Sequence, residues 1–141
     1  MENNQIKKVL YTAKGHTTDG RDGGTSRSSD GRLDIKFSAP GISGTGTNPV
    51  HLFGAGWSAC FISAMRIVAG KMNVGVPEDV AVDIEVDLCL TGDGYSLQAR
   101  LNVSLPGLKR ETAQNLADAA HLTCPYSKAT RGNIDVEINV V

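Results

Sequence analysis

A run of apolar and very small residues, LFGAGWSACFISAM, occupies positions 52–65 and constrains the fold of this chain more than any other segment. The pair Asn48-Pro49 just before it is a typical helix start, because asparagine accepts a hydrogen bond from the first helical turn and proline fits its first position. We therefore predict a helix from Asn48 to about Lys71. Since this helix is apolar on nearly every side, we expect it to be buried all round.

Alternating apolar and polar residues on both sides of this helix predict β-strands. One long hairpin is expected over 80–105, with its turn at 91–94. A second helix is expected over 108–124 and ends before Pro125, because proline disfavours a helical residue before it. Further strands are predicted at 6–13, 33–37 and 134–140, and glycine-rich loops at 16–31 and 40–47.

This order of elements predicts one α+β domain over residues 1–141, with antiparallel sheets around a long buried central helix. A chain of 141 residues has room for only a modest core. Such an apolar helix is hard to cover within one copy, which favours a dimer that wraps it.

The charge pattern argues against several classes of partner. The net charge is −1 and there is no basic block, so neither nucleic acid nor an anionic membrane is expected as the main partner. The N-terminus has no continuous apolar run and therefore predicts no signal peptide. Residues 52–68 are too few, and too interrupted by Gly, Ser and Arg66, to span a bilayer. We expect a cytoplasmic protein.

The cysteine count predicts reduced thiols rather than a secreted disulfide framework. Three cysteines at wide spacing do not suit such a framework. The chain has neither a CxxC nor an HExxH motif, and its histidines are scattered, so the sequence predicts no metal site. The cysteines are Cys60, Cys89 and Cys124, and the histidines are His16, His51 and His121.

Cys60 and Cys124 each admit two interpretations, whereas Cys89, on the polar face of a predicted strand, reads as a bystander. Cys60 either packs as a small hydrophobe or attacks a peroxide as a thiolate and becomes a sulfenic acid. Cys124 is either a helix-end residue selected for its size or the thiol that condenses with that sulfenic acid. The second interpretation requires the fold to bring their Cβ atoms to about 3.5–4.5 Å.

A thiolate at Cys60 needs a nearby cation, because burial in an apolar helix would raise its pKa. Arg21, in the segment DGRDGG, is one candidate, since a guanidinium stays charged and offers several donors. Arg131, in ATRGN, is a second candidate. Each of these two arginines is also consistent with an ordinary solvated residue in a turn.

Six segments, in order and over nearly the whole length, resemble the organic hydroperoxide resistance proteins, the Ohr branch of the OsmC/Ohr family. They are KVLYTAKG at 8–15, GRDG at 20–23, SSDGRLDIKFSAPG at 28–41, TNP at 47–49, LFGAGWSACF at 52–61 and CPYSKATRGNIDV at 124–136. The resemblance implies an OsmC-like fold and an intertwined homodimer with two active sites near the subunit interface.

The resemblance also implies a cysteine-based peroxidase of the oxidative stress response that reduces organic hydroperoxides to alcohols. Cys60 matches the family's peroxide-attacking cysteine, Cys124 its resolving cysteine, and Arg21 the arginine that stabilises the thiolate. In such proteins a lipoylated protein reduces the resulting disulfide, so an external dithiol is implied and no bound metal or flavin. The surroundings expected to favour a fatty-acid-like peroxide are Phe53, Trp57, Phe61 and Tyr126.

One departure from the family pattern lies directly after TNP, where the family has Glu-Gln and this chain has Val50-His51. The resemblance assigns that glutamate to holding the arginine over the cysteine, which valine cannot do. Loss of a charge-assisted hydrogen bond costs about 1.5–3 kcal/mol, enough to slow a step tenfold or more. Three consequences stay open: Asp19 or Asp22 anchors Arg21, His51 compensates in part, or the peroxidase is weak.

Two other functions are alternatives. A non-catalytic dimer that binds an apolar ligand or senses redox state is favoured by Val50 and predicts ligand binding, or disulfide formation, without turnover by a dithiol. An acyl-thioester hydrolase of the hotdog type also wraps a sheet around a long helix, but it uses a carboxylate or backbone amides. The predicted helix 48–71 contains no Asp or Glu, which argues against that class.

Overall fold

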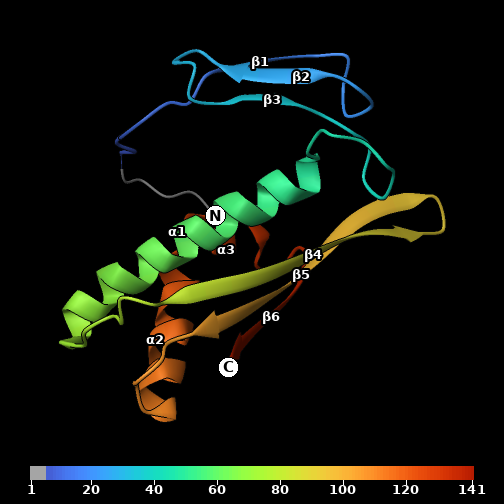
Figure 1. Ribbon diagram of the computed structural model, residues 1–141. Coiled ribbons are helices and arrows are strands. Elements are labelled where there is room, and N and C mark those ends of the chain that lie inside the picture. The colour runs from blue at the N-terminus through green and yellow to red at the C-terminus, as the bar shows by residue number, and fades with distance from the viewer. Residues whose placement is uncertain (1–5) are drawn as a thin grey trace. The chain divides into compact units, whose positions relative to one another are not determined.

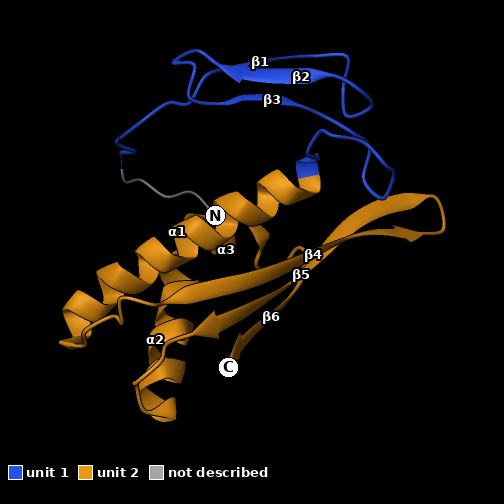
Figure 2. Cartoon of the chain, in the orientation of Figure 1, with its two compact units in different colours: residues 1–49 blue, residues 50–141 orange. Residues whose placement is uncertain are grey.

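The computed structural model describes residues 6–141, and the chain divides into two compact units, residues 1–49 and 50–141 (Figure 2). The first unit carries Arg21 and the second carries all three cysteines. The single domain over 1–141 remains a prediction.

The first unit contains a three-stranded antiparallel sheet in the order β1-β2-β3 (Figure 1). The predicted strand at 33–37 is confirmed as β3. The predicted strand at 6–13 is wrong, because residues 6–14 are exposed and form no strand, and the predicted loop 16–31 contains two strands. The strands are β1 (Gly15–Thr18), β2 (Thr25–Ser28) and β3 (Asp34–Lys36).

These two unexpected strands consist of small and polar residues and therefore lack an apolar alternation. Their backbone ladder pairs Gly15 with Ser28 and Thr18 with Thr25. Hydroxyl groups add cross-strand hydrogen bonds, at 2.8 Å between Thr17 and Ser26 and 3.3 Å between Thr18 and Thr25. The β-branched threonines suit a strand, although no buried face marks it in the sequence.

The second unit places two long helices, one short helix and three strands along the chain (Figure 1). The predicted helices, hairpin and last strand are confirmed to within about two residues at each end. The elements are α1 (Pro49–Met72), β4 (Ala81–Thr91), β5 (Gly94–Ser104), α2 (Arg110–Thr123), α3 (Pro125–Thr130) and β6 (Asp135–Val140). The short α3 is not among the predicted elements. It forms because Pro125, which ends α2, also fits the first position of a new helix.

The sheet of the second unit has the order β4-β5-β6 and is mixed. Strands β4 and β5 pair antiparallel, with Ile84 opposite Leu101. Strands β5 and β6 pair parallel, with Leu101 opposite Ile138, so the expectation of purely antiparallel sheets is wrong. The reason is the connection: α2 and α3 form a crossover that returns the chain to the same end of the sheet, as a parallel pair requires.

The core of the second unit lies between the apolar face of this sheet and the helices. Its fully buried large side chains include Trp57, Phe61 and Met65 from α1, Leu101 and Val103 from β5, and Leu116 from α2. The apolar side chains of the hairpin pack into this core up to the Val86–Ala99 pair. Beyond it, Leu88, Leu90 and Tyr95 are exposed at 43%, 61% and 72%.

Within one chain the helix α1 buries one face rather than all of its surface. Burial all round requires cover by a second copy and remains a prediction. Its buried residues recur three or four positions apart, from Gly54 through Trp57 and Phe61 to Val68. The opposite face carries mainly small residues, whose exposure costs little, together with Arg66 and the exposed Ile67. By length and composition alone α1 could cross a membrane, but its buried face belongs to the core of the second unit.

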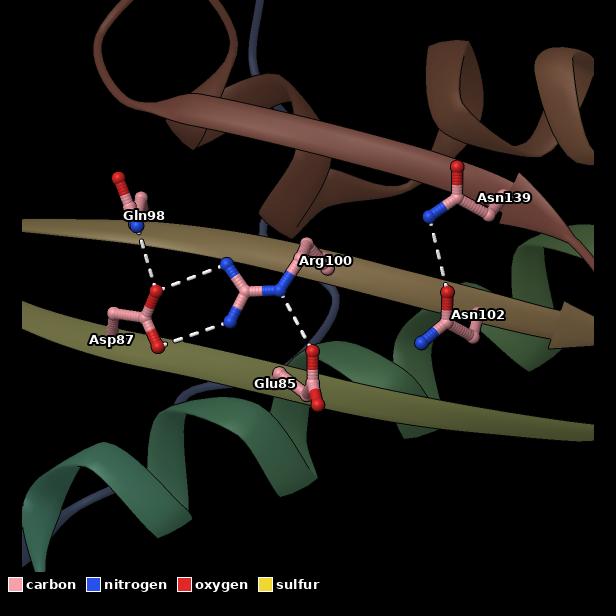
Figure 3. Close-up of polar contacts among 6 residues, drawn as sticks. All are labelled: Glu85, Asp87, Gln98, Arg100, Asn102 and Asn139. Atoms are coloured by element: carbon pink, nitrogen blue, oxygen red, sulfur yellow. Dashed lines mark hydrogen bonds and ion pairs between the residues drawn. The ribbon is translucent and has the colours of Figure 1, made fainter.

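The other face of this sheet is polar and is organised around Arg100 (Figure 3). The guanidinium donates two hydrogen bonds to Asp87, at 2.9 and 3.0 Å, and one to Glu85 at 2.7 Å. Gln98 donates a further bond to Asp87 at 2.7 Å. These bonds join β4 and β5 and hold the pKa of Asp87 at about 2, below its ordinary 3.8, chiefly through Arg100 and then Gln98.

We expect the free energy of unfolding to fall between pH 4 and pH 2 partly through Asp87. Its pKa is lower in the folded chain than in the unfolded one, so its contribution is present above the unfolded pKa and is lost as the pH falls toward about 2. Urea unfolding of Asp87→Asn should therefore show a shallower loss across this range. Asp83→Asn, on the same strand, is the control, and an unchanged slope in Asp87→Asn would contradict the prediction.

Candidate dithiol site

Cys60 lies on α1 at the edge of its buried face. It is half-buried and packs against the core of the second unit, next to the fully buried Phe61. The small residues around it have a packing reason. A Cβ at Gly54 would lie 3.4 Å from Ile84 and 3.5 Å from Val86, so the helix backbone lies close to β4. Gly54 lowers the helix propensity of α1, but its lack of a side chain lets the helix pack closely on the sheet.

Cys124 forms the corner between α2 and α3 and has no exposed surface. Its extended backbone, with φ −63° and ψ 125°, ends one helix and begins the next. Its N–H donates to the carbonyl of Ala120 at 2.8 Å, and its own carbonyl accepts from the N–H of Lys128 at 2.9 Å. Both helices therefore fix the position of this thiol.

Cys60 and Cys124 come together in one core although they are far apart in the sequence. Burial raises the pKa of the Cys60 thiol above its ordinary value, and the charge of the neighbouring Cys124 raises it further. Both thiols are free. Since both influences disfavour a thiolate at Cys60, a reactive Cys60 requires a positive charge in addition to these two groups.

Aromatic side chains pack in the same core as this pair of thiols. Phe53 lies 5.5 Å from Trp57 and 6.2 Å from Tyr126, measured between ring centroids. Tyr126 packs over the helix at Gly56, one turn before Cys60, where a Cβ would lie only 2.9 Å from its hydroxyl oxygen. Of the aromatic residues expected near the site, Trp57 and Phe61 are fully buried and Phe53 and Tyr126 are half-buried.

One buried hydrogen bond ties α1 to α3 beside the thiols. The indole N–H of Trp57 donates to Ser127 Oγ at 3.1 Å, and neither residue has exposed surface. Sequence reasoning did not single out Ser127. No pattern marks it, because a serine next to a predicted turn is ordinarily solvated.

Arg21 lies in the first unit, in the turn between β1 and β2, and is exposed. The turn needs glycine: Gly20 and Gly23 have φ of +67° and +94°, and a Cβ at Gly24 would lie 2.2 Å from two carbonyl oxygens. Asp19 and Asp22 flank Arg21, but within residues 6–141 the structure gives Arg21 no ion pair with either. The carboxylate anchor for Arg21 therefore stays unassigned.

Val50 and His51 lie in the first turn of α1, and this turn contains no acidic residue. The first turn of α1 thus has no carboxylate of its own where the family pattern has its glutamate. Cys89 is half-buried on β4, and its sulfur lies 3.9 Å from the carbonyl oxygen of Asp87. Its interpretation as a bystander remains a prediction.

Arg131, the second candidate cation, lies in the second unit and bonds a backbone carbonyl. Its guanidinium donates to the carbonyl of His121 at 2.7 Å. Burial, and then the charge of Arg131, lower the pKa of the His121 imidazole, while Asp118 opposes this shift. His121 Nδ1 is buried and has no hydrogen-bond partner among the described residues.

A hollow of about 840 Å³ lies in the first unit, over the sheet β1-β2-β3. Most of its lining is polar or charged, including Lys14, Arg27 and Lys36, and it contains neither Arg21 nor a cysteine. A pocket for an apolar ligand is lined mainly by hydrophobic side chains, so we place the candidate site at the thiols instead. Within residues 6–141, no three His, Cys, Asp or Glu side chains cluster as a metal site would require.

Comparison with known proteins relates nearly the whole chain to one family. The sequence profile of OsmC-like proteins matches residues 42–139. The organic hydroperoxide resistance protein of Xanthomonas axonopodis pv. citri (strain 306) is 44% identical over 138 residues, which cover 95% of this chain and 96% of that protein. OhrB of Bacillus subtilis (strain 168), also an organic hydroperoxide resistance protein, is 40% identical over 135 residues, covering 94% of this chain and 98% of that one.

Solved structures give the same relationship. The crystal structure of OhrB of Bacillus subtilis has a TM-score of 0.84 to this chain at 39% identity, and covers 94% of this chain and 100% of its own. The crystal structure of an organic hydroperoxide resistance protein OsmC from Legionella pneumophila has a TM-score of 0.87 at 39% identity, and covers 94% of this chain and 98% of its own.

Proposed function

Because this chain belongs to the OsmC/Ohr family and has its α+β fold, with two small sheets and a long central helix, we propose that it is a thiol-dependent peroxidase that reduces organic hydroperoxides to alcohols. The observation that carries this proposal is the approach of Cys60 and Cys124 within one apolar core. A lone buried cysteine would suit packing alone, whereas a second thiol beside it is what peroxide chemistry needs.

The proposed cycle has three steps. The Cys60 thiolate attacks the outer peroxide oxygen, the O–O bond breaks, and the alkoxide takes a proton and leaves as the alcohol; Cys60 becomes a sulfenic acid. The Cys124 thiol then displaces the hydroxyl group as water and forms a disulfide with Cys60. An external dithiol, of the kind carried by a lipoylated protein, reduces this disulfide and is itself oxidised to a disulfide. The cycle requires no bound metal or flavin.

The substrate class is inferred from the side chains that surround the thiols. Phe53 packs against Trp57 and Tyr126 near Cys60, and the half-buried rings of Phe53 and Tyr126 offer mainly apolar surface. An alkyl or fatty-acid-like hydroperoxide is stabilised by burying its chain against such surface, and hydrogen peroxide is not. We therefore propose a preference for apolar hydroperoxides.

We propose that Arg21 supplies the cation that Cys60 lacks. Arg21→Ala should then raise the pH at which Cys60 is alkylated at half its maximal rate, and slow peroxide reduction by about tenfold or more. The measurement is the pH profile of iodoacetamide modification of Cys60. Arg27→Ala is the matched control, because Arg27 already pairs with Asp34 at 3.2 Å. An unchanged profile in Arg21→Ala would remove Arg21 from this role.

We further propose that the protein is a cytoplasmic homodimer. Exposed large apolar side chains include a group in the segment 6–11 and another at the hairpin end, at Leu88, Leu90 and Tyr95. A soluble protein rarely exposes groups of large apolar side chains to water, so we expect a second copy of the chain to cover them. Sedimentation equilibrium tests this: the mass of two chains is expected, and the mass of one chain would contradict it.

The second candidate function is a dimer that binds an apolar ligand or senses redox state without turnover. It is favoured by the first turn of α1, which has Val50 and no acidic residue, and by the raised pKa of Cys60. The two functions differ in the fate of the disulfide. A peroxidase is returned to its thiols by a dithiol and reacts again, whereas a sensor reacts slowly and without repeated turnover.

The deciding experiment is peptide and intact mass after one equivalent of cumene hydroperoxide, and then after added dihydrolipoamide. A Cys60–Cys124 disulfide that forms rapidly and is then reduced supports the peroxidase. If Cys60 fails to react while circular dichroism shows an intact fold, the ligand-binding function is favoured. A disulfide that includes Cys89 would contradict the assignment of Cys124.

A further inference from the structure

The corner between α2 and α3, where Cys124 lies, leaves one helix carbonyl without its usual hydrogen-bond donor. In a continuous helix the carbonyl of His121 would accept from the backbone N–H of residue 125. Residue 125 is proline, which has no N–H, and the extended backbone of Cys124 directs the chain away from the axis of α2. The carbonyl of His121 therefore needs a donor from elsewhere, as the last carbonyls of a helix generally do.

Arg131 provides that donor. Its Nη1 lies 2.7 Å from the carbonyl oxygen of His121, so a residue at the end of α3 bonds the last turn of α2. The backbone N–H of Arg131 also donates to the carbonyl of Ser127 at 2.8 Å and ends α3. The side-chain bond thereby joins the two ends of the segment 121–131, and Cys124 lies at the bend between them.

We propose that Arg131 is a positioning residue for the resolving thiol: its bond to His121 keeps the α2–α3 corner closed, so that Cys124 is held ready to meet oxidised Cys60. This inference rests on the proposed function. It gives Arg131 a different task from the one it would have as a cation beside Cys60. A positive charge at the C-terminus of α2 also interacts favourably with the helix dipole, which strengthens the closure.

The inference separates two steps of the cycle. Attack on the peroxide depends on the Cys60 thiolate and on Arg21, the cation proposed for it, so it should keep its rate when Arg131 is replaced. Disulfide formation depends on the position of Cys124 and should slow. A longer-lived sulfenic acid reacts more often with a second peroxide molecule, so over-oxidation of Cys60 to the sulfinic acid should increase. A purely structural role would instead alter folding without selecting one chemical step.

The test compares the wild type, Arg131→Gln, Arg131→Lys and the control Lys128→Gln in single-turnover reactions with cumene hydroperoxide. Lys128→Gln removes a positive charge from the same short helix but leaves the bond to His121. Alcohol production reports the attack, and quenched samples analysed by mass report the disulfide and the over-oxidised protein. Circular dichroism reports the fold of each variant.

Arg131→Gln is expected to slow disulfide formation about tenfold, the effect of losing one charge-assisted hydrogen bond, with attack unchanged. Wild-type disulfide formation in this variant, or slower attack with a higher alkylation pH for Cys60, would overturn the inference. If Arg131→Gln does not fold, Arg131→Lys decides by the same two rates. A wild type that forms no Cys60–Cys124 disulfide would instead refute the proposed function.

Discussion

Cys60→Ser is expected to reduce organic hydroperoxide turnover to the rate of the uncatalysed reaction, a loss of about a thousandfold or more as for other catalytic nucleophiles. A serine hydroxyl stays protonated at neutral pH and has no polarisable sulfur to attack the peroxide. The position is half-buried at the edge of the core, so the smaller polar atom should be tolerated. Consumption of cumene hydroperoxide with dihydrolipoamide as reductant measures the effect.

Cys89→Ser is the matched control for that experiment. It removes a thiol from the same unit, on β4 rather than on α1, and should keep the wild-type rate. Repeated turnover by Cys60→Ser would show that another group reacts with the peroxide, and the mechanism would then fail. Loss of activity in Cys89→Ser would show that the third thiol is no bystander.

The bounds of α1 could be predicted from sequence because local signals agree there. Asn48-Pro49 starts the helix at the residue where the structure begins it, and a long apolar run follows. Its exposure could not be predicted from the same run. Alanine, glycine and serine resemble core residues in an apolar count, yet leaving Ala55, Ala59 and Ser63 in water costs little free energy.

The two strands of the first unit show the opposite difficulty. Sequence patterns detect a strand through its buried face, and β1 and β2 have polar or small residues on both faces. Their pairing depends on backbone bonds and on hydroxyl groups that meet across the strands, such as Thr17 with Ser26. The direction of β6 could not be predicted from its own residues either. The crossover through α2 and α3 determines that it runs parallel to β5.

The candidate site was accessible from sequence mainly through resemblance, since no spacing rule joins Cys60 to Cys124. The contact of α1 with the α2–α3 corner depends on the hydrogen bond from Trp57 to Ser127 and on the packing of Phe53 against Tyr126. One local signal does point to the corner. A proline four residues after His121 leaves the carbonyl of His121 without its helical donor, which predicts a donor such as Arg131 nearby.

Cys124→Ser is expected to perform one attack and then fail, because the sulfenic acid at Cys60 finds no second thiol. A first equivalent of cumene hydroperoxide should still yield one equivalent of alcohol at the wild-type rate. Excess peroxide without a reductant should then add two or three oxygen atoms to Cys60 irreversibly, as sulfinic and sulfonic acids. Intact mass over a peroxide titration measures both stages, and the wild type should end as the disulfide.

The position of Cys124 makes a second variant necessary. The side chain has no exposed surface, so a serine hydroxyl there needs a hydrogen-bond partner that sulfur did not, and some loss of stability is expected. Cys124→Ala removes the thiol without adding a polar group and should give the same over-oxidation. If Cys60 resists excess peroxide in both variants as it does in the wild type, Cys124 is a buried packing residue and not the resolving thiol. Over-oxidation in both, with one equivalent of alcohol formed first, would assign the two thiols their separate steps.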